Sequence, residues 1–373
     1  MSGRCPAGAA WLLRRLRGAA GSSMSLCGTP GPAGSGGGGA GSSWPRRSPP
    51  CLRLAEVAGA EPQRANDLLL LLPPAAARRG PEPPQHHVVY FPGDVQNYHE
   101  VMSCHPENFQ WEHWSFENVA SILAHRFPNS FVWVVKCSRM HLHKFSCYDN
   151  FVASNMFGAP EHSSHFGAFR HLHALLTNAF RLAQNVLLSQ KSGLDKDAEV
   201  VAGQSQQQTG PTANGCSSME RERAGECASN STVNFSAPSA VGAVSFTLVG
   251  FSKGCVVLNQ LLYELKEAKK DKNTDAFLKN IKAIYWLDGG HSGGSNTWVT
   301  YPEVLKELAQ TGIEVHAHVT PYQVFDTMRS WIGREHERFV QILEELGVEI
   351  DDQLHFADEA PSLDNHFRVH EVF

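Results

Sequence analysis

Ser252 lies at the centre of the pentapeptide GFSKG, residues 250–254, which has the pattern Gly-x-Ser-x-Gly. The apolar run over residues 243–249 predicts a buried strand before it, and the amphipathic run over residues 255–269 predicts a helix after it. A strand that turns directly into a helix strains its middle residue, and the flanking glycines let neighbouring backbone approach closely. This context predicts a serine nucleophile. The alternative interpretation is a nucleotide-type sheet in which Ser252 only caps a helix.

A serine hydroxyl acts as a nucleophile when a base takes its proton and an acid fixes the orientation of that base. His366 fits the base because it follows the last predicted strand, residues 353–357, where this order of elements places the histidine. His370 is the neighbouring alternative, and a surface histidine in a tail is the interpretation without catalysis.

Two aspartates compete for the role of the acid. Asp326 is preferred, because the residues between it and His366 contain the one helix and one strand that the usual hydrolase order requires. Asp288 is the alternative, and it begins a glycine-dense loop, residues 288–294, that is suited to lining a substrate site.

An acyl-transfer reaction also needs two backbone N–H groups directed at the developing oxyanion. The N–H of Lys253, which follows the serine, supplies one by its position, and Gly93 or Asp94 in the loop after the first strand supplies the second. The side chain of Lys253 is expected to point away from the serine hydroxyl, so it is not expected to act as the base.

The body of the chain, residues 87–373, alternates predicted strands with predicted helices. The strands are at residues 87–91, 131–135, 243–249, 281–287, 313–319 and 353–357, and the helices at residues 115–126, 166–188, 255–269, 302–309 and 332–346. This alternation predicts an α/β domain with a doubly wound, mostly parallel sheet and helices on both faces. Residues 189–240 have no periodicity and predict a disordered insertion.

The first 55 residues have the composition of a targeting segment. They contain seven arginines and no lysine, aspartate or glutamate. Arginine without acid is typical of a mitochondrial transit peptide, and a secretory signal is the alternative, although arginines interrupt its apolar stretch. Residues 56–86 are interpreted as a joint rich in proline and leucine. Removing the seven arginine charges from the formal net charge of −5 leaves −12 for the remainder.

Charge and motif content argue against several functional classes. An acidic body without a basic stripe disfavours nucleic acid as a partner, and the leucine run at residues 68–72 is too short to span a bilayer. No Gly-x-Gly-x-x-Gly follows the first predicted strand and no P-loop lysine motif is present, which disfavours a nucleotide cofactor, and no cofactor is expected. No metal site is expected either, because no local carboxylate or cysteine completes the histidine pairs, which are His141/His143, His171/His173 and His316/His318.

Three segments resemble a known family: GFSKG at residues 250–254, DGGHSGG at residues 288–294, and NHFRVHEVF at residues 365–373. They resemble the vertebrate members of a family of mitochondrial proteins that is itself similar to lipases and esterases of the α/β-hydrolase fold. The resemblance covers residues 87–373 and implies a serine hydrolase fold, a mitochondrial matrix location and a role in maintaining the respiratory chain. The wider lipid-droplet hydrolases have a similar order of elbow, late acid and final histidine, which implies the triad Ser252, Asp326 and His366.

Two functions follow from these residues. The first is a serine hydrolase that cleaves an ester, thioester or amide of a small-molecule or lipid substrate through an acyl-serine. The second is a catalytically inactive scaffold of the same fold that binds a protein or lipid partner in mitochondria, because a fold does not fix a function.

Overall fold

The computed structural model describes residues 51–74, 85–155, 158–202 and 244–373, with the backbone alone described over residues 190–202. Residues 1–50 of the predicted targeting segment lie outside the described residues. No helix in the described part of the chain has both the length and the apolar character that crossing a membrane requires.

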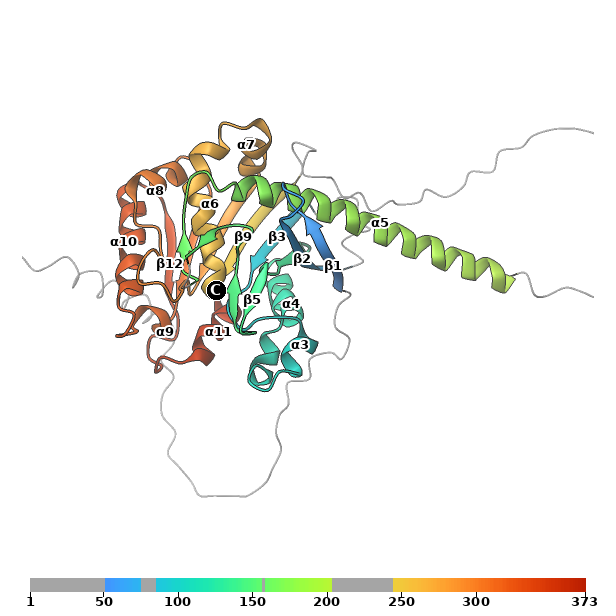
Figure 1. Cartoon of the computed structure of the whole chain (residues 1–373), viewed down its shortest axis with the longest axis horizontal. Helices are drawn as coiled ribbons and strands as arrows, with labels where there is room; N and C mark the ends of the chain where they lie inside the picture. Colours follow the sequence, from blue (N-terminus) through green and yellow to red (C-terminus); the bar gives the residue numbers. More distant parts are fainter. Residues whose placement is uncertain (1–50, 75–84, 156–157, 203–243) are drawn as a thin grey trace, which may run out of the picture.

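In the described residues, a large sheet of eight strands has the order β1-β2-β4-β3-β9-β10-β11-β12 (Figure 1). Neighbouring strands from β4 to β12 are parallel, whereas β2 is antiparallel to both β1 and β4. The strands are β1 (Cys51–Ala58), β2 (Ala65–Leu71), β3 (His86–Phe91), β4 (Phe131–Val135), β9 (Ser245–Phe251), β10 (Ile281–Leu287), β11 (Glu314–Val319) and β12 (Ile350–Leu354). Two small hairpins lie outside this sheet: β5 (Arg139–His141) with β6 (Phe145–Cys147), and β7 (Ala153–Ser154) with β8 (Pro160–Glu161).

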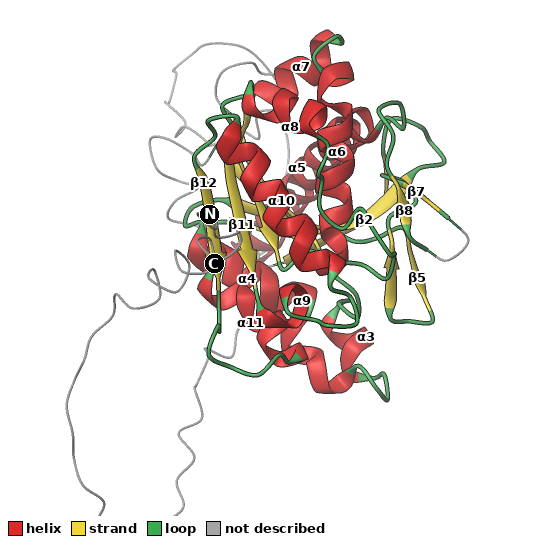
Figure 2. Cartoon of the chain, turned by 90° about the vertical axis from the view of Figure 1, so that its left-hand side faces the viewer, coloured by secondary structure: helices red, strands yellow, loops and turns green. Residues whose placement is uncertain are grey.

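Helices cover both faces of the sheet, because successive strand residues point to opposite sides and both sides are apolar. One core lies under α5 (Ala168–Ala202), α6 (Cys255–Ala268), α7 (Lys272–Lys279), α8 (Pro302–Ala309) and α10 (Trp331–Glu345). The other lies under η1 (Phe109–Trp114), α4 (Phe116–Arg126) and α11 (Leu363–Val372). Leu248 and Val249, adjacent on β9, belong to different cores. Figure 2 shows α8 and α10 beside the β12 edge.

The remaining short elements lie at the edge where the parallel strands end. Helix α9 (Pro321–Val324) follows β11, and α3 (His99–Ser103) follows β3. In Figure 1, α9, α11 and the β5–β6 hairpin lie toward the lower edge of the sheet, while α7 lies at the top. Ligands of open α/β sheets bind at the carboxyl ends of the strands, so this lower edge is where a site is expected.

These elements confirm the predicted α/β-hydrolase-like fold with its mostly parallel sheet and helices on both faces. The predicted strands at residues 87–91, 131–135 and 281–287 match β3, β4 and β10 within one residue. The last strand is three residues earlier than predicted, at Ile350–Leu354.

The predicted start of the folded domain at residue 87 is wrong. Strands β1 and β2 form the antiparallel end of the sheet, and Leu68, Leu69 and Leu70 are fully or almost fully buried there. The leucine run that was interpreted as a joint is therefore a core strand. The strand pattern of β1 is broken by a bulge between Leu54 and Val57, where Glu56 has a φ of 50°, and a bulge interrupts the alternation that identifies a strand.

The predicted insertion begins later than residue 189, because α5 continues as a helix to Ala202. Figure 1 shows α5 running beyond the β1 edge of the sheet. The start of α5 is held by Glu264 of α6, whose carboxylate accepts hydrogen bonds from the N–H groups of Gly167, Ala168 and Phe169. These are groups that a helix start leaves without partners, and a carboxylate is favoured there. Residues 203–243 lie outside the described residues.

Candidate active site

The turn between β9 and α6 has the geometry expected of a nucleophile elbow. Ser252 has a backbone φ of 51°, a value that residues other than glycine rarely adopt. The residue is 8% exposed. A Cβ on Gly250 would lie 2.8 Å from Leu258 Cδ1, and one on Gly254 would overlap the carbonyl oxygen of Phe91. Only glycine therefore lets α6 and β3 approach this turn, as the Gly-x-Ser-x-Gly pattern predicts.

Replacing Gly254 by alanine should lower the free energy of unfolding by about 3 kcal/mol or more, because the added methyl group meets rigid backbone of β3. Denaturant unfolding followed by circular dichroism measures this change. Gly294→Ala is the matched control, since no described atom lies within 4 Å of its Cβ position. Equal stability losses in the two variants would contradict the close approach at Gly254.

The structure places Asp288 against His366. Nδ1 of His366 lies 2.6 Å from Oδ2 of Asp288, and both side chains are buried. The Asp288 carboxylate also accepts hydrogen bonds from Thr320, at 2.7 Å from its N–H and at 2.6 Å from its hydroxyl. A fully buried carboxylate that faces three hydrogen-bond partners is held in one orientation. Asp288 is thus arranged to fix the tautomer of His366.

The register of the sheet explains how Asp288 reaches this position. Leu287 at the end of β10 pairs with Phe251 at the end of β9, so the next residues, Asp288 and Ser252, leave neighbouring strands side by side. Asp288 has a φ of 46° and donates its N–H to the carbonyl of His318. His366 comes from the first turn of α11, with its ring 4.5 Å from that of Phe251.

The preferred acid, Asp326, is not brought to His366 and needs correction. Its carboxylate binds Nε of Arg329 at 2.7 Å and the N–H of Met328 at 2.8 Å. These hydrogen bonds and the adjacent positive charge of Arg329 lower the pKa of Asp326. Helix α9 follows β11 and separates Asp326 from the strand end, and the carboxylate in contact with His366 is that of the alternative, Asp288.

His370, the alternative base, lies in a different environment. It is 1% exposed, its Nδ1 donates to the carbonyl of Phe367, and its Nε2 lies 2.8 Å from the Tyr90 hydroxyl. Burial lowers the pKa of His370 to about 3. Both ring nitrogens are engaged in the core, so His370 is arranged for packing.

The loop after β3 borders the serine, but the N–H of Gly93 is already engaged. A Cβ on Gly93 would lie 2.8 Å from Ser252 Cβ, which places this glycine directly beside the serine. The Gly93 N–H donates to Oε1 of Gln96 at 2.8 Å. This N–H, which the sequence suggested as the second oxyanion donor, is therefore already used within the loop. The role of the Lys253 N–H as the first oxyanion donor stays a prediction.

Two further charged groups lie beside the site. The Nζ of Lys253 donates to the carbonyl of Gly158 at 2.7 Å, so this side chain points away from the hydroxyl as expected. Burial lowers the pKa of Lys253, and the nearby Asp94 carboxylate opposes that change. Burial raises the pKa of Asp94, which the hydrogen bond from the Ser146 N–H and the charges of Lys253 and His366 partly offset.

The glycine-dense loop after Asp288 is held from both sides. Gln323 of α9 fills the space beside Gly290, where a Cβ would lie 2.6 Å from the Gln323 amide. Glu335 of α10 accepts hydrogen bonds from the N–H groups of Asn296, Thr297 and Trp298, which end the loop. The loop therefore has one defined course past the site.

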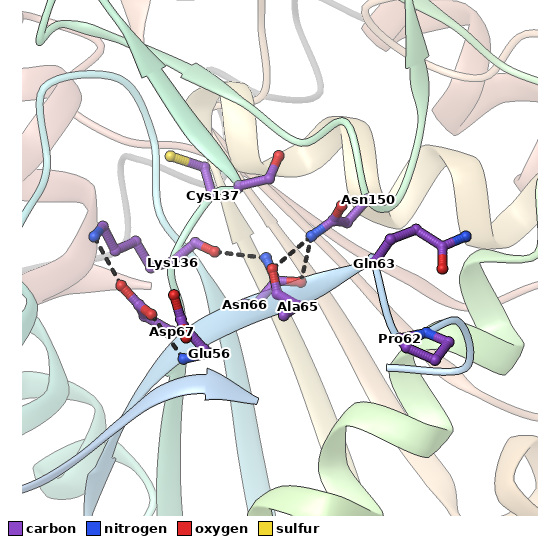
Figure 3. A pocket seen from close by; sticks show the side chains of 10 residues that line it. Glu56, Pro62, Gln63, Ala65, Asn66, Asp67, Lys136, Cys137 and Asn150 are labelled. Carbon is purple, nitrogen blue, oxygen red and sulfur yellow. Dashed lines mark hydrogen bonds and ion pairs between the residues drawn. The ribbon is translucent and has the colours of Figure 1, made fainter. Parts of the chain in front are cut away.

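A polar cavity of about 560 Å³ lies beside β2 and the end of β4 rather than at the triad. Figure 3 shows Asn66 bonded to Asn150 and Lys136 paired with Asp67 on its wall. Ser252, Asp288 and His366 are absent from its lining, and its polar side chains already bind one another. This cavity is therefore not the acyl site.

Sequence reasoning missed three residues that shape the site: Thr320, Gln96 and Tyr322. Thr320 positions Asp288, Gln96 binds the Gly93 N–H, and the Tyr322 ring lies 4.7 Å from that of His366. A threonine directly after a predicted strand is a signal that could have identified Thr320. Gln96 and Tyr322 carry no such signal, because their contacts depend on tertiary structure.

Comparisons with known proteins identify the family. The family model C2orf69 matches residues 53–349. The chain is 62% identical over 364 residues to the human mitochondrial protein C2orf69, covering 94% of each chain. It is 44% identical over 329 residues to the zebrafish homologue of mitochondrial protein C2orf69, covering 86% of this chain and 85% of that one.

The structural comparison is more distant. A putative carboxylesterase from Lactobacillus plantarum matches 82% of this chain and 86% of its own, with a TM-score of 0.39 and 10% identity. A likeness at that level says nothing about activity. The family match over most of the sequence is decisive by itself, and the chain therefore belongs to the C2orf69 family of mitochondrial proteins.

Proposed function

We propose that this protein is a serine hydrolase in which Ser252, His366 and Asp288 form the catalytic triad. The observation that carries the proposal is the buried pair of His366 and Asp288, 2.6 Å apart, beside a serine held at a φ of 51°. Strained backbone at a functional serine and a carboxylate that orients a histidine are the two features that acyl transfer needs.

In the proposed mechanism, the hydroxyl of Ser252 attacks the acyl carbon while Nε2 of His366 takes its proton. Asp288 binds the other ring nitrogen, Nδ1, so Nε2 is the nitrogen that takes the proton in this proposal. The N–H groups of Lys253 and Asp94 stabilise the oxyanion. The leaving group takes the proton from His366, and water then hydrolyses the acyl-serine by the same steps.

The substrate in this proposal carries an apolar acyl group. Phe325 and Met328, which follow α9, are 52% and 84% exposed, and Leu142 and Phe145 of the β5–β6 hairpin are also exposed. The hairpin contacts the loop beside the serine, since the Ser146 hydroxyl donates to the carbonyl of Gly93. Exposed apolar side chains on two segments that border the same site favour an apolar ligand.

Labelling with alkyl fluorophosphonates tests this function. We expect the wild type to be labelled, and faster by a probe with a long alkyl chain than by one with a short chain. Ser252→Ala should abolish labelling, and His366→Ala should lower its rate by about 10³-fold or more. Melting temperatures measured alongside establish that the variants are folded.

Ser245→Ala is the matched control for this experiment. Ser245 begins β9, and its hydroxyl lies 2.9 Å from Nδ1 of His86 on the neighbouring strand β3. The substitution therefore removes a serine–histidine contact that lies outside the elbow. Labelling of this variant should equal that of the wild type. A folded wild type that no probe labels would instead support the second candidate, a scaffold that binds a protein or lipid partner. The low exposure of Ser252 is the observation that favours this alternative.

We also propose that the protein works in the mitochondrial matrix. The relatives are named mitochondrial proteins, and the segment before β1 is rich in arginine and free of acidic residues, as matrix-targeting peptides are. Protection from protease after rupture of the outer membrane supports this location, and digestion under those conditions contradicts it. A role in maintaining the respiratory chain is part of the same proposal, and oxygen consumption in cells that carry only the Ser252→Ala protein tests it.

A further inference from the structure

A cluster of imidazole and carboxylate groups lies on β11 and β12, apart from the triad. His316 and His318 project from the same face of β11, and Asp351 of β12 pairs with His316 across the sheet. Nδ1 of His316 lies 3.0 Å from Oδ2 of Asp351, and Nε2 of His318 lies 3.9 Å from the same oxygen. One possible ligand atom from each of the three residues lies within 4.8 Å of the other two. Among the described residues, this is the one group of three with that geometry.

A ring nitrogen of this cluster, Nε2 of His318, is buried without a hydrogen bond among the described residues. His318 is 1% exposed. A buried ring nitrogen without a hydrogen bond costs free energy, because folding removes it from water. Its position 3.9 Å from the Asp351 carboxylate leaves a gap that is too long for a hydrogen bond and suited to a bridging ion.

A contact with His355 fixes the orientation of the His318 ring in this cluster. Nδ1 of His318 lies 2.9 Å from Nε2 of His355, so the Nδ1–H of His318 can donate to His355 while Nε2 keeps its lone pair. A histidine that binds a metal usually donates its other N–H to a neighbouring group in this way.

We propose that His316, His318 and Asp351 bind a divalent transition-metal ion, with Zn²⁺ the best match to two imidazoles and one carboxylate. Metal–ligand distances of about 2.0–2.2 Å in a tetrahedral site require ligand atoms roughly 3.3–3.6 Å apart, which the 3.0 and 3.9 Å separations bracket. Water supplies the fourth ligand, since the His316 and Asp351 side chains are 17% and 41% exposed.

The bound ion would join the edge strand β12 to the interior of the sheet. Its ligands come from paired residues of β11 and β12, so binding opposes separation of these strands. The carbonyl of His318 accepts the N–H of Asp288, so the same segment of β11 also supports the turn of the candidate acid. The site is therefore structural and does not overlap the acyl site.

Binding of Zn²⁺ and Co²⁺ to the purified, metal-stripped chain tests the proposal. We expect one ion per chain with a dissociation constant on the order of micromolar or tighter, and visible Co²⁺ absorption typical of four-coordination. Zn²⁺ at about 100 times its dissociation constant should raise the melting temperature by about 5 °C.

Three variants separate this site from simple hydrogen bonding. Asp351→Asn, at a partly exposed position that tolerates substitution, should weaken binding at least about tenfold, as should His316→Gln. His355→Leu, which removes the acceptor of the His318 N–H, should weaken it by about 10- to 100-fold. Asp352→Asn is the matched control: Asp352 follows Asp351 on β12 and binds His336 of α10, on the opposite face of the strand from the cluster, so affinity should not change.

Two results would overturn the proposal. The first is a folded wild type that binds neither Zn²⁺ nor Co²⁺ at stoichiometric concentration. The cluster would then be a network of hydrogen-bonded histidines without a metal ion. The second is equal affinity in the wild type, Asp351→Asn and His316→Gln, which would place the bound ion elsewhere on the chain.

Discussion

Replacing Asp288 by asparagine should slow labelling of Ser252 by about 10⁴-fold, whereas Asp326→Asn should leave the rate within about threefold of wild type. Asparagine keeps the size of Asp288 and can still accept from the Thr320 N–H, but it carries no charge and can present an N–H to Nδ1 of His366. That contact favours the tautomer with its proton on Nε2, which cannot accept the serine proton. The second-order rate of inactivation by a fluorophosphonate measures the effect.

The two aspartates also control for each other. Both variants replace an acidic residue near the same edge of the sheet, but only Asp288 contacts His366, while Asp326 contacts Arg329. Melting temperatures should show that each variant is folded before rates are compared. A normal rate for Asp288→Asn together with loss of labelling in Asp326→Asn would restore the assignment that element order suggested.

Acid should destabilise this protein, because histidines in the described part of the chain are buried in neutral form, His87, His291 and His370 among them. Burial lowers the pKa of these three groups from 6.5 to about 3 in each case. Between those values the unfolded chain binds more protons, so the free energy of unfolding is at its full value above pH 6.5 and falls as the pH drops. Each of the three groups adds up to about 1.4 kcal/mol per pH unit to this slope, so together they contribute about 4 kcal/mol per pH unit. Urea unfolding measured from pH 7 to pH 5 gives this slope.

His87→Phe should reduce the measured slope by about 1.4 kcal/mol per pH unit, because one of these groups is removed. The ring of His87 stacks on Phe131 at 4.9 Å, so phenylalanine fits among its neighbours, although the indole N–H of Trp133 loses its acceptor. Val88→Ala, at the next and fully buried position, is the control. It should lower stability equally at every pH and leave the slope unchanged. An unchanged slope in His87→Phe would contradict the explanation.

The elbow could be predicted from the sequence because its determinants are local. A strand, a turn with glycines at fixed positions and a helix all fall within residues 243–269, and each glycine is required by a contact that follows from this geometry. The same order of elements predicts His366 as the base, and the structure places its ring against Asp288. Local patterns of this kind also fixed the strands of the parallel part of the sheet, whose continuous apolar runs are typical of strands buried on both faces.

The choice between Asp288 and Asp326 could not be settled in this way. Counting elements favoured Asp326, but the outcome depends on the register that pairs Leu287 with Phe251 and on the hydrogen bonds from Thr320. Neither is visible in a single sequence. The carboxylate that completes the histidine cluster was missed for the same reason, since Asp351 belongs to a different strand and meets His316 only by cross-strand pairing.

The position of β9 divides the candidate active site between two parts of the chain. Ser252, Asp288 and His366 all follow β9, whereas Gly93 and Asp94 precede it, and the two parts meet where β3 pairs with β9. Two separate polypeptides, one ending after α5 and the other beginning at β9, would each lack a strand partner and part of the site. Labelling of Ser252 in a mixture of the two polypeptides would then show that they have reassembled into one sheet. The fold itself therefore offers a way to detect the association of its two parts.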